Sequence, residues 1–118
     1  MNVLDTKKHR VDFFRKIPYK QKNKGRRGDH EIYVLELDGH AISIHKLSRG
    51  NHQIYGNLMR KILRVELGLS RDEYTEIVGC YEDLAFFLRT WSKNGKLPQK
   101  FDHESYIKRE GLGNTVLS

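Results

Sequence analysis

Two alternating runs joined by Asp38-Gly39 constrain the fold of this chain more than any other feature. Apolar residues alternate between two faces from Glu31 to Leu37, and a second alternation extends from His40 to His45. Asp-Gly is a preferred pair for the two-residue type I′ turn that joins antiparallel strands. The sequence therefore predicts a β-hairpin.

The second strand of this hairpin has a mixed pattern of polar and apolar residues. Its alternation would place Ile42 and Ile44 on one face with His40, and Ala41, Ser43 and His45 on the other. An antiparallel sheet can pack one face on a core and leave the other in water. We therefore expect the face carrying Ser43 and His45 to be open to a ligand.

Helical spacing is found on both sides of the hairpin. Residues 7–16 precede it, with Asp5 or Thr6 available as an N-cap and Pro18 as a stop; the apolar positions are Val11, Phe14 and Ile17. Residues 53–67 follow it and end at Gly68, with an apolar stripe of Ile54, Leu58, Ile62 and Val65. We predict a helix in each segment.

The C-terminal third divides into two parts. A capping box from Ser70 to Glu73 predicts a short helix that ends near Gly79. Residues 81–92 predict another amphipathic helix, whose Phe86, Phe87 and Trp91 either cover the core or dock a partner. From Lys93 the chain is polar and broken by Pro98, so we expect a mobile tail. The expected domains are residues 1–79 and an extension over residues 80–118.

Composition narrows the functional classes. The 118 residues carry a net charge of +7 and one cysteine, Cys80, which we expect to be a buried small hydrophobe. A single cysteine excludes an intramolecular disulfide, and no Cys/His spacing indicates zinc. No apolar run approaches the ~20 residues of a membrane span, and no Gly-rich phosphate loop is present. We expect a cytoplasmic protein without metal or cofactor, no membrane partner, and a polyanionic ligand.

Cations recur in the segment before the hairpin. Its alternation from Ile17 to Lys22 allows a short strand that runs into a loop. The cations are suited to RNA phosphates, and Tyr33 could add stacking on a base; a solvated charged loop is the alternative. The predicted RNA-binding residues are Lys20, Lys22, Lys24, Arg26, Arg27 and Tyr33, and Lys61 and Arg64 could extend the set.

His30 is the candidate catalytic residue, because it lies between this basic loop and the first strand of the hairpin. A neutral imidazole can accept the 2′-hydroxyl proton of RNA, and nearby cations can offset charge on the phosphorane. Asp29 or Glu31 could orient the ring, and His45 could be a second acid or base. The alternative is an exposed histidine that merely begins a strand.

The order helix, three strands and helix, with Gly28-Asp29-His30 opening the second strand and Gly68-Leu69-Ser70 closing the second helix, resembles the HicA-type toxins over about residues 8–78. The resemblance implies an α+β fold like the double-stranded RNA-binding domain, here with a C-terminal helical extension. It also implies a metal-independent endoribonuclease, an mRNA interferase, with His30 as catalytic residue and a cognate antitoxin protein as partner.

Two other functions stay open from the sequence. Glu31 stands where the HicA-type pattern has a second histidine, and residues 43–46 replace a segment that usually contains proline. A non-catalytic RNA-binding module of the same fold is therefore the first alternative. A protein-interaction adaptor that docks through Phe86, Phe87 and Trp91 is the second.

Overall fold

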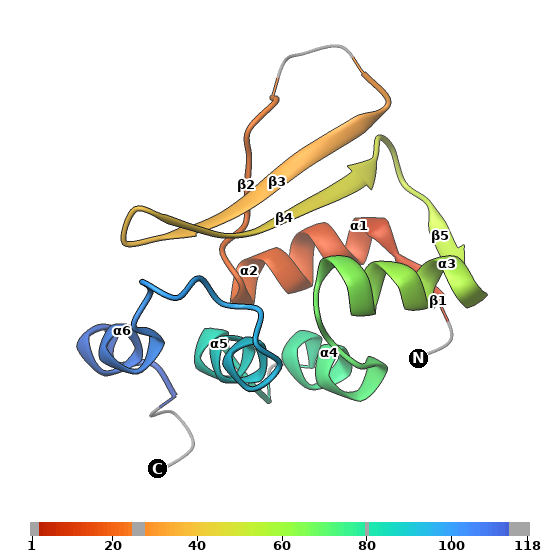
Figure 1. Ribbon diagram of the computed structural model, residues 1–118. Helices are drawn as coiled ribbons and strands as arrows, with labels where there is room; N and C mark the ends of the chain where they lie inside the picture. The colour runs from red at the N-terminus through yellow and green to blue at the C-terminus, as the bar shows by residue number, and fades with distance from the viewer. Residues whose placement is uncertain (1–2, 25–27, 80, 114–118) are drawn as a thin grey trace.

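The computed structural model describes residues 3–24, 28–79 and 81–113 of the chain. It has an α+β fold in which a three-stranded antiparallel sheet, ordered β2-β3-β4, lies over two layers of helices (Figure 1). The strands are β2 (Lys20–Gln21), β3 (His30–Leu37) and β4 (His40–Ser48). A separate two-stranded sheet pairs β1 (Val3–Asp5) with β5 (Gln53–Tyr55).

The predicted hairpin is confirmed as β3 and β4. Asp38 and Gly39 have φ values of 51° and 77°, and two positive φ values are what a type I′ turn requires. The ladder runs from the His30–Ser48 pair to the Leu37–His40 pair, with a bulge beside Leu35 and Glu36. The bulge leaves one extra residue in β4, because Leu35 pairs with Ser43 and Glu36 with Ala41.

The predicted faces of β4 are wrong. Ile44 is 59% exposed, whereas Ser43 and His45 are 6% and 0% exposed and face the helices. The bulge is the first reason, since it turns Ile42 inward together with Ser43 instead of opposite to it. Buried partners are the second reason: the Tyr19 hydroxyl donates to Ser43 Oγ at 2.7 Å.

The first helical segment comprises α1 (Thr6–Lys8), the π-helical turn η1 (His9–Phe13) and α2 (Phe14–Lys16). Asp5 caps it as predicted, accepting hydrogen bonds from the Lys7 and Lys8 amides. Val11 is 59% exposed while Phe13 is fully buried, so the expected apolar stripe is wrong at these positions. The π turn, closed by the Phe14 amide donating to the His9 carbonyl, rotates the buried face relative to an ideal α-helix.

The second segment comprises α3 (Gly56–Lys61) and the π-helical turn η2 (Ile62–Glu66). Residues 53–55, which the sequence assigned to this helix, form β5 instead. Leu58 and Val65 are 58% and 64% exposed, whereas Met59, Leu63 and Leu67 are buried. A hydrogen bond from the Leu67 amide to the Ile62 carbonyl closes η2 and offsets the stripe that the sequence predicts.

Three further helices form the layer farthest from the sheet (Figure 1). They are α4 (Arg71–Val78), α5 (Leu84–Lys93) and α6 (His103–Glu110), and the predicted capping box of α4 is present. Phe87 and Trp91 are buried, and Trp91 Nε1 donates to the Leu67 carbonyl at 2.7 Å, so α5 covers the core. Phe86 is half-buried, and Cys80 lies outside the described residues.

The segment after Lys93 differs from the expected mobile tail, because it contains α6. Phe101 and Ile107 are buried in the core. Arg109 Nη2 donates to the Asp38 carboxylate, which joins α6 to the turn of the hairpin. Of the helices in the described ranges, none combines the length and apolar character needed to cross a membrane.

Candidate functional site

His30 is the first residue of β3 and is exposed to solvent. A side chain holds its backbone from the β2 side: Asn23 Nδ2 donates to the His30 carbonyl at 2.8 Å. The Ile32 amide in turn donates to Asn23 Oδ1 at 2.9 Å. Asn23 therefore continues the pairing of β2 with β3 beyond the end of β2, up to His30.

The residues just before His30 are held from the β4 side. The Arg49 amide donates to the Asp29 carbonyl at 3.0 Å, and Arg49 Nε donates to the Gly28 carbonyl. His52 Nε2 donates to the Arg49 carbonyl at 2.6 Å. An exposed imidazole is therefore carried on a backbone with hydrogen-bond partners on both flanks.

His30 lies on the face of the sheet that no described helix covers (Figure 1). It shares this open face with Ile32 and Val34, because residues two apart on a strand point to the same side. Register places Lys46 beside Ile32 and Lys20 beside Val34, and the Lys22 amide donates to the Ile32 carbonyl at 2.8 Å. This surface thus has an aliphatic centre flanked by exposed lysines. The term open face refers below to the residues Lys20, Lys22, His30, Ile32, Val34, Ile44 and Lys46.

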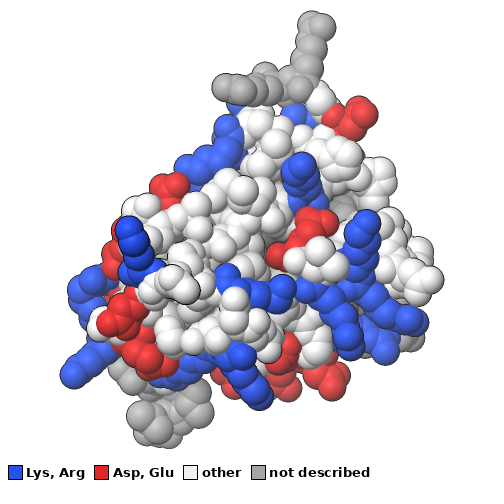
Figure 2. All heavy atoms as spheres, viewed as in Figure 1, with Lys and Arg blue, Asp and Glu red and all other residues white. Residues whose placement is uncertain are grey.

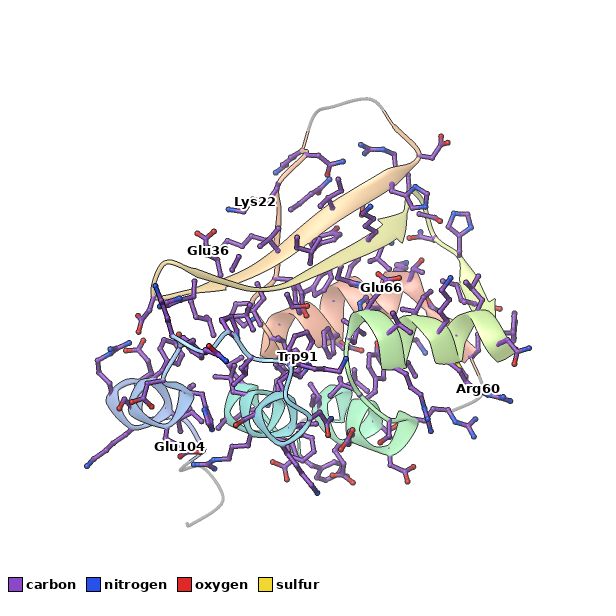
Figure 3. The ribbon with its side chains drawn as sticks, in the orientation of Figure 1. Lys22, Glu36, Arg60, Glu66, Trp91 and Glu104 are labelled. Carbon is purple, nitrogen blue, oxygen red and sulfur yellow. The ribbon has the colours of Figure 1, made fainter. Side chains whose placement is uncertain are left out.

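A hollow of about 380 Å³ lies on the open face, beside the edge strand β2. Lys20 and Lys22 line it with Val34, and Glu36 is the acidic residue at its border; Figure 3 labels Lys22 and Glu36 on this side of the sheet. Two of the predicted RNA-binding lysines are therefore exposed together. Lys24 and Asp29 are exposed as well, whereas Arg26 and Arg27 lie outside the described residues.

Glu31 does not point towards His30, because alternation turns it to the helical side of β3. Its Oε1 accepts hydrogen bonds from Arg10 Nε at 2.8 Å and from the Tyr33 hydroxyl at 2.7 Å. Burial alone would raise the pKa of Glu31, but these hydrogen bonds and the charges of Arg10 and Arg49 hold it below its ordinary value. Glu31 is thus a charged structural group, and its predicted accessory role at the imidazole of His30 is wrong.

Tyr33 is 8% exposed, and its ring centroid lies 4.4 Å from that of Phe14. Burial on the helical side of the sheet leaves no face of this ring for a base, so the predicted stacking is wrong. Apolar residues lie on both faces of β3, Ile32 and Val34 on one and Tyr33, Leu35 and Leu37 on the other, so the alternation alone did not show which face would be buried.

His45 belongs to a buried chain of four side chains that the sequence did not predict. Tyr74 Oη lies 2.6 Å from His9 Nδ1, the two histidine Nε2 atoms lie 3.0 Å apart, and His45 Nδ1 lies 2.9 Å from Glu66 Oε1. Figure 3 labels Glu66, the member nearest to solvent. The predicted role of His45 as a surface acid or base is therefore wrong, because its side chain is 0% exposed.

One set of tautomers satisfies every member of this chain with both rings neutral. The Glu66 carboxylate only accepts, so His45 Nδ1 carries hydrogen and His45 Nε2 accepts from His9 Nε2. His9 Nδ1 then accepts from the Tyr74 hydroxyl. Burial, and then the nearby His45 and Arg10, lower the pKa of His9 well below its ordinary value.

Among the described residues, no group of three or more His, Cys, Asp or Glu side chains is placed to hold a metal ion. The chain matches no family model, no curated protein and no solved structure.

Proposed function

We propose that this chain is a HicA-like, RNA-cleaving toxin of a toxin–antitoxin pair, a metal-independent endoribonuclease with His30 as general base. The observation that carries the proposal is the placement of His30: an exposed imidazole on a backbone held by Asn23 and Arg49, on a lysine-flanked open face. A general base needs this combination of access and fixed position.

In the proposed reaction, His30 removes the proton of a ribose 2′-hydroxyl. The 2′-oxygen then attacks the adjacent phosphorus, and the bond from phosphorus to the 5′-oxygen breaks. The products are a 2′,3′-cyclic phosphate and a 5′-hydroxyl, whose proton comes from solvent because His45 is buried. Lys22 and Lys46 offset the negative charge that builds up on the phosphorane.

The open face also favours a particular mode of RNA binding. Its centre of Ile32, Val34 and Ile44 is aliphatic, and its lysines reach the phosphates. Contacts to phosphate and ribose are typical of binding that reads backbone shape rather than base edges. Helices before and after three antiparallel strands also agree with the double-stranded RNA-binding-domain-like arrangement that the resemblance implies.

A cognate antitoxin protein is the proposed regulatory partner. An acidic surface with apolar residues at its centre would complement the lysines and the aliphatic centre of the open face. Covering this face would deny RNA access to His30.

The test uses labelled RNA incubated with the purified protein in EDTA. The expected result is cleavage with cyclic-phosphate ends by the wild type and by His103→Ala, a control in α6, with none by His30→Ala. The His30→Ala variant should still retard the RNA, since phosphate contacts supply most of the affinity. Equal cleavage by all three proteins would overturn the assignment of His30.

Burial of His45 favours the non-catalytic RNA-binding module as the second candidate, because it removes one of the two predicted proton-transfer groups. Salt-sensitive retardation of RNA without cleavage by the wild type would select that function. The adaptor function loses support, since Phe87 and Trp91 are buried against the core.

A further inference from the structure

A hollow of about 280 Å³ opens between η2 and α4, on the helical side of the molecule. Its apolar floor comes from Leu63 and Leu69, each 1% exposed, and its lining is otherwise Arg60, Arg64 and Arg71. None of the described residues that line it carries a carboxylate. Figure 2 shows a gathering of basic side chains over α3 and beside α4, and Figure 3 labels Arg60 there.

Two arginines of this hollow, Arg60 and Arg64, differ from several others in the described chain in their partners. Arg10, Arg89 and Arg109 each form an ion pair with a carboxylate. Arg60, by contrast, donates only to Asn57 Oδ1, at 3.4 Å, and Arg64 has no hydrogen bond or ion pair within residues 3–24, 28–79 and 81–113. Arg60 and Arg64 carry like charges with no carboxylate partner among the described residues, so they repel one another, and an anion bound between them would relieve that repulsion.

A second hollow of about 310 Å³ continues from the first, since both are lined by Arg64 and Leu69. It extends past Ser70 and Asn94 to Lys96. Glu73 also lines it, but its Oε1 accepts from the Ser70 amide at 2.8 Å as part of the α4 cap. Together the two hollows form an arginine groove with cations from Arg60 to Lys96 along its length.

We propose that the arginine groove is a second binding site for the RNA backbone, a deduction that rests on the proposed function. Guanidinium groups bind phosphate oxygens through paired hydrogen bonds, and an elongated cationic groove follows a chain of phosphates. Leu58 in α3 and Val65 in η2 are exposed apolar side chains, but they line neither hollow. The groove itself is therefore suited to phosphates more than to a protein partner. An RNA that passes round the β4 edge of the sheet contacts the open face and the groove together.

The test compares the double variant Arg60→Gln/Arg64→Gln with Lys100→Gln/Lys108→Gln, a control that removes the same charge from exposed positions in the C-terminal extension. Binding of a labelled single-stranded RNA of about 16 nucleotides is measured over a range of salt concentrations, with circular dichroism and melting temperature as checks of folding. Since each phosphate contact contributes about 0.7 to the slope of log affinity against log salt, the groove variant should lose about 1.4 and the control almost nothing.

Three outcomes would overturn the groove proposal. The first is an unchanged slope in the groove variant, and the second is an equal loss in the control, which would reflect net charge alone. The third is binding of poly-glutamate by the wild type that the groove variant loses while its RNA slope stays the same, which would assign the groove to an acidic polypeptide. This experiment measures RNA binding and not cleavage. The groove proposal can therefore be supported even if the protein never cleaves RNA, and each proposal can be contradicted without the other.

Discussion

The Nε2 atoms of His9 and His45 lie 3.0 Å apart in the core, where the two residues are 1% and 0% exposed. Two histidines this close can be buried only if a single proton lies between their facing nitrogens. Tyr74 and Glu66 set that arrangement, because one donates to His9 and the other accepts from His45. These four hydrogen-bonded side chains join η1, β4, η2 and α4. A change in their protonation therefore changes the stability of the whole fold.

Stability should decrease as the pH falls below about 6.5, the ordinary pKa of histidine. The pKa of His9 is lowered in the folded protein, so the unfolded chain takes up a proton first and the native state loses free energy. The loss should approach about 1.4 kcal/mol per pH unit, the value for one proton. Urea unfolding at about pH 7.5 and 5.5 measures it, well above the range in which carboxylates titrate.

A matched pair of variants assigns that pH dependence. Glutamine in place of His9 keeps one donor and one acceptor but cannot titrate in this range, so His9→Gln should flatten the dependence. The control is Gln99→Ala, a substitution at an exposed position without a titratable side chain, which should leave the dependence unchanged. A free energy of unfolding that stays level in the wild type between the two pH values would contradict the expectation.

Removing the Tyr74 hydroxyl should destabilise the fold without affecting the proposed chemistry. Tyr74→Phe leaves His9 Nδ1 buried without its donor, which costs about 1–3 kcal/mol. Tyr81→Phe is the control, because Tyr81 is 74% exposed. Urea unfolding gives the difference, and RNA cleavage by the folded Tyr74→Phe protein should equal that of the wild type; a selective loss of cleavage would give this buried chain a catalytic role.

Local signals in the sequence predicted local structure well. The turn at Asp38-Gly39 and the capping box of Ser70 and Glu73 each form from residues close together in the sequence. Both could therefore be deduced from a few neighbouring residues. The residues that face the core were predicted poorly in three places. The π turns η1 and η2 and the β4 bulge each shift which residues point inward. No local pattern reveals these irregularities, whose stability depends on packing against other elements.

The buried chain of side chains could not be predicted for a different reason. His9 is 65 residues from Tyr74 and 36 residues from His45, so their contact depends on the complete tertiary fold. The position of His30 at the start of the first hairpin strand could be predicted, because the alternating pattern that follows it is local.

Glu31 should matter for stability and not for the protonation of His30. Glu31→Gln removes the charge that Arg10 and Tyr33 contact, and should cost about 1–2 kcal/mol because the hydrogen bonds lose their charge assistance. The pH profile of RNA cleavage should keep its position, since Glu31 lies on the other side of β3 from His30. A profile displaced by half a pH unit or more would show that Glu31 acts on the imidazole after all.

Asn23 should influence cleavage through position alone. Asn23→Ala removes the hydrogen bond to the His30 carbonyl, the one from the Ile32 amide and a longer one of 3.4 Å from Gln21 Nε2, and it leaves every lysine of the open face in place. Misplacement of a catalytic group by a fraction of an ångström lowers kcat, so we expect a loss of about tenfold with KM nearly unchanged. Single-turnover cleavage and RNA retardation, measured beside the exposed-site control Gln99→Ala, separate the two effects. A rise in KM with constant kcat would mean that Asn23 binds RNA directly, whereas a loss in kcat alone would mean that the rigidity of the backbone at His30 is itself part of the site.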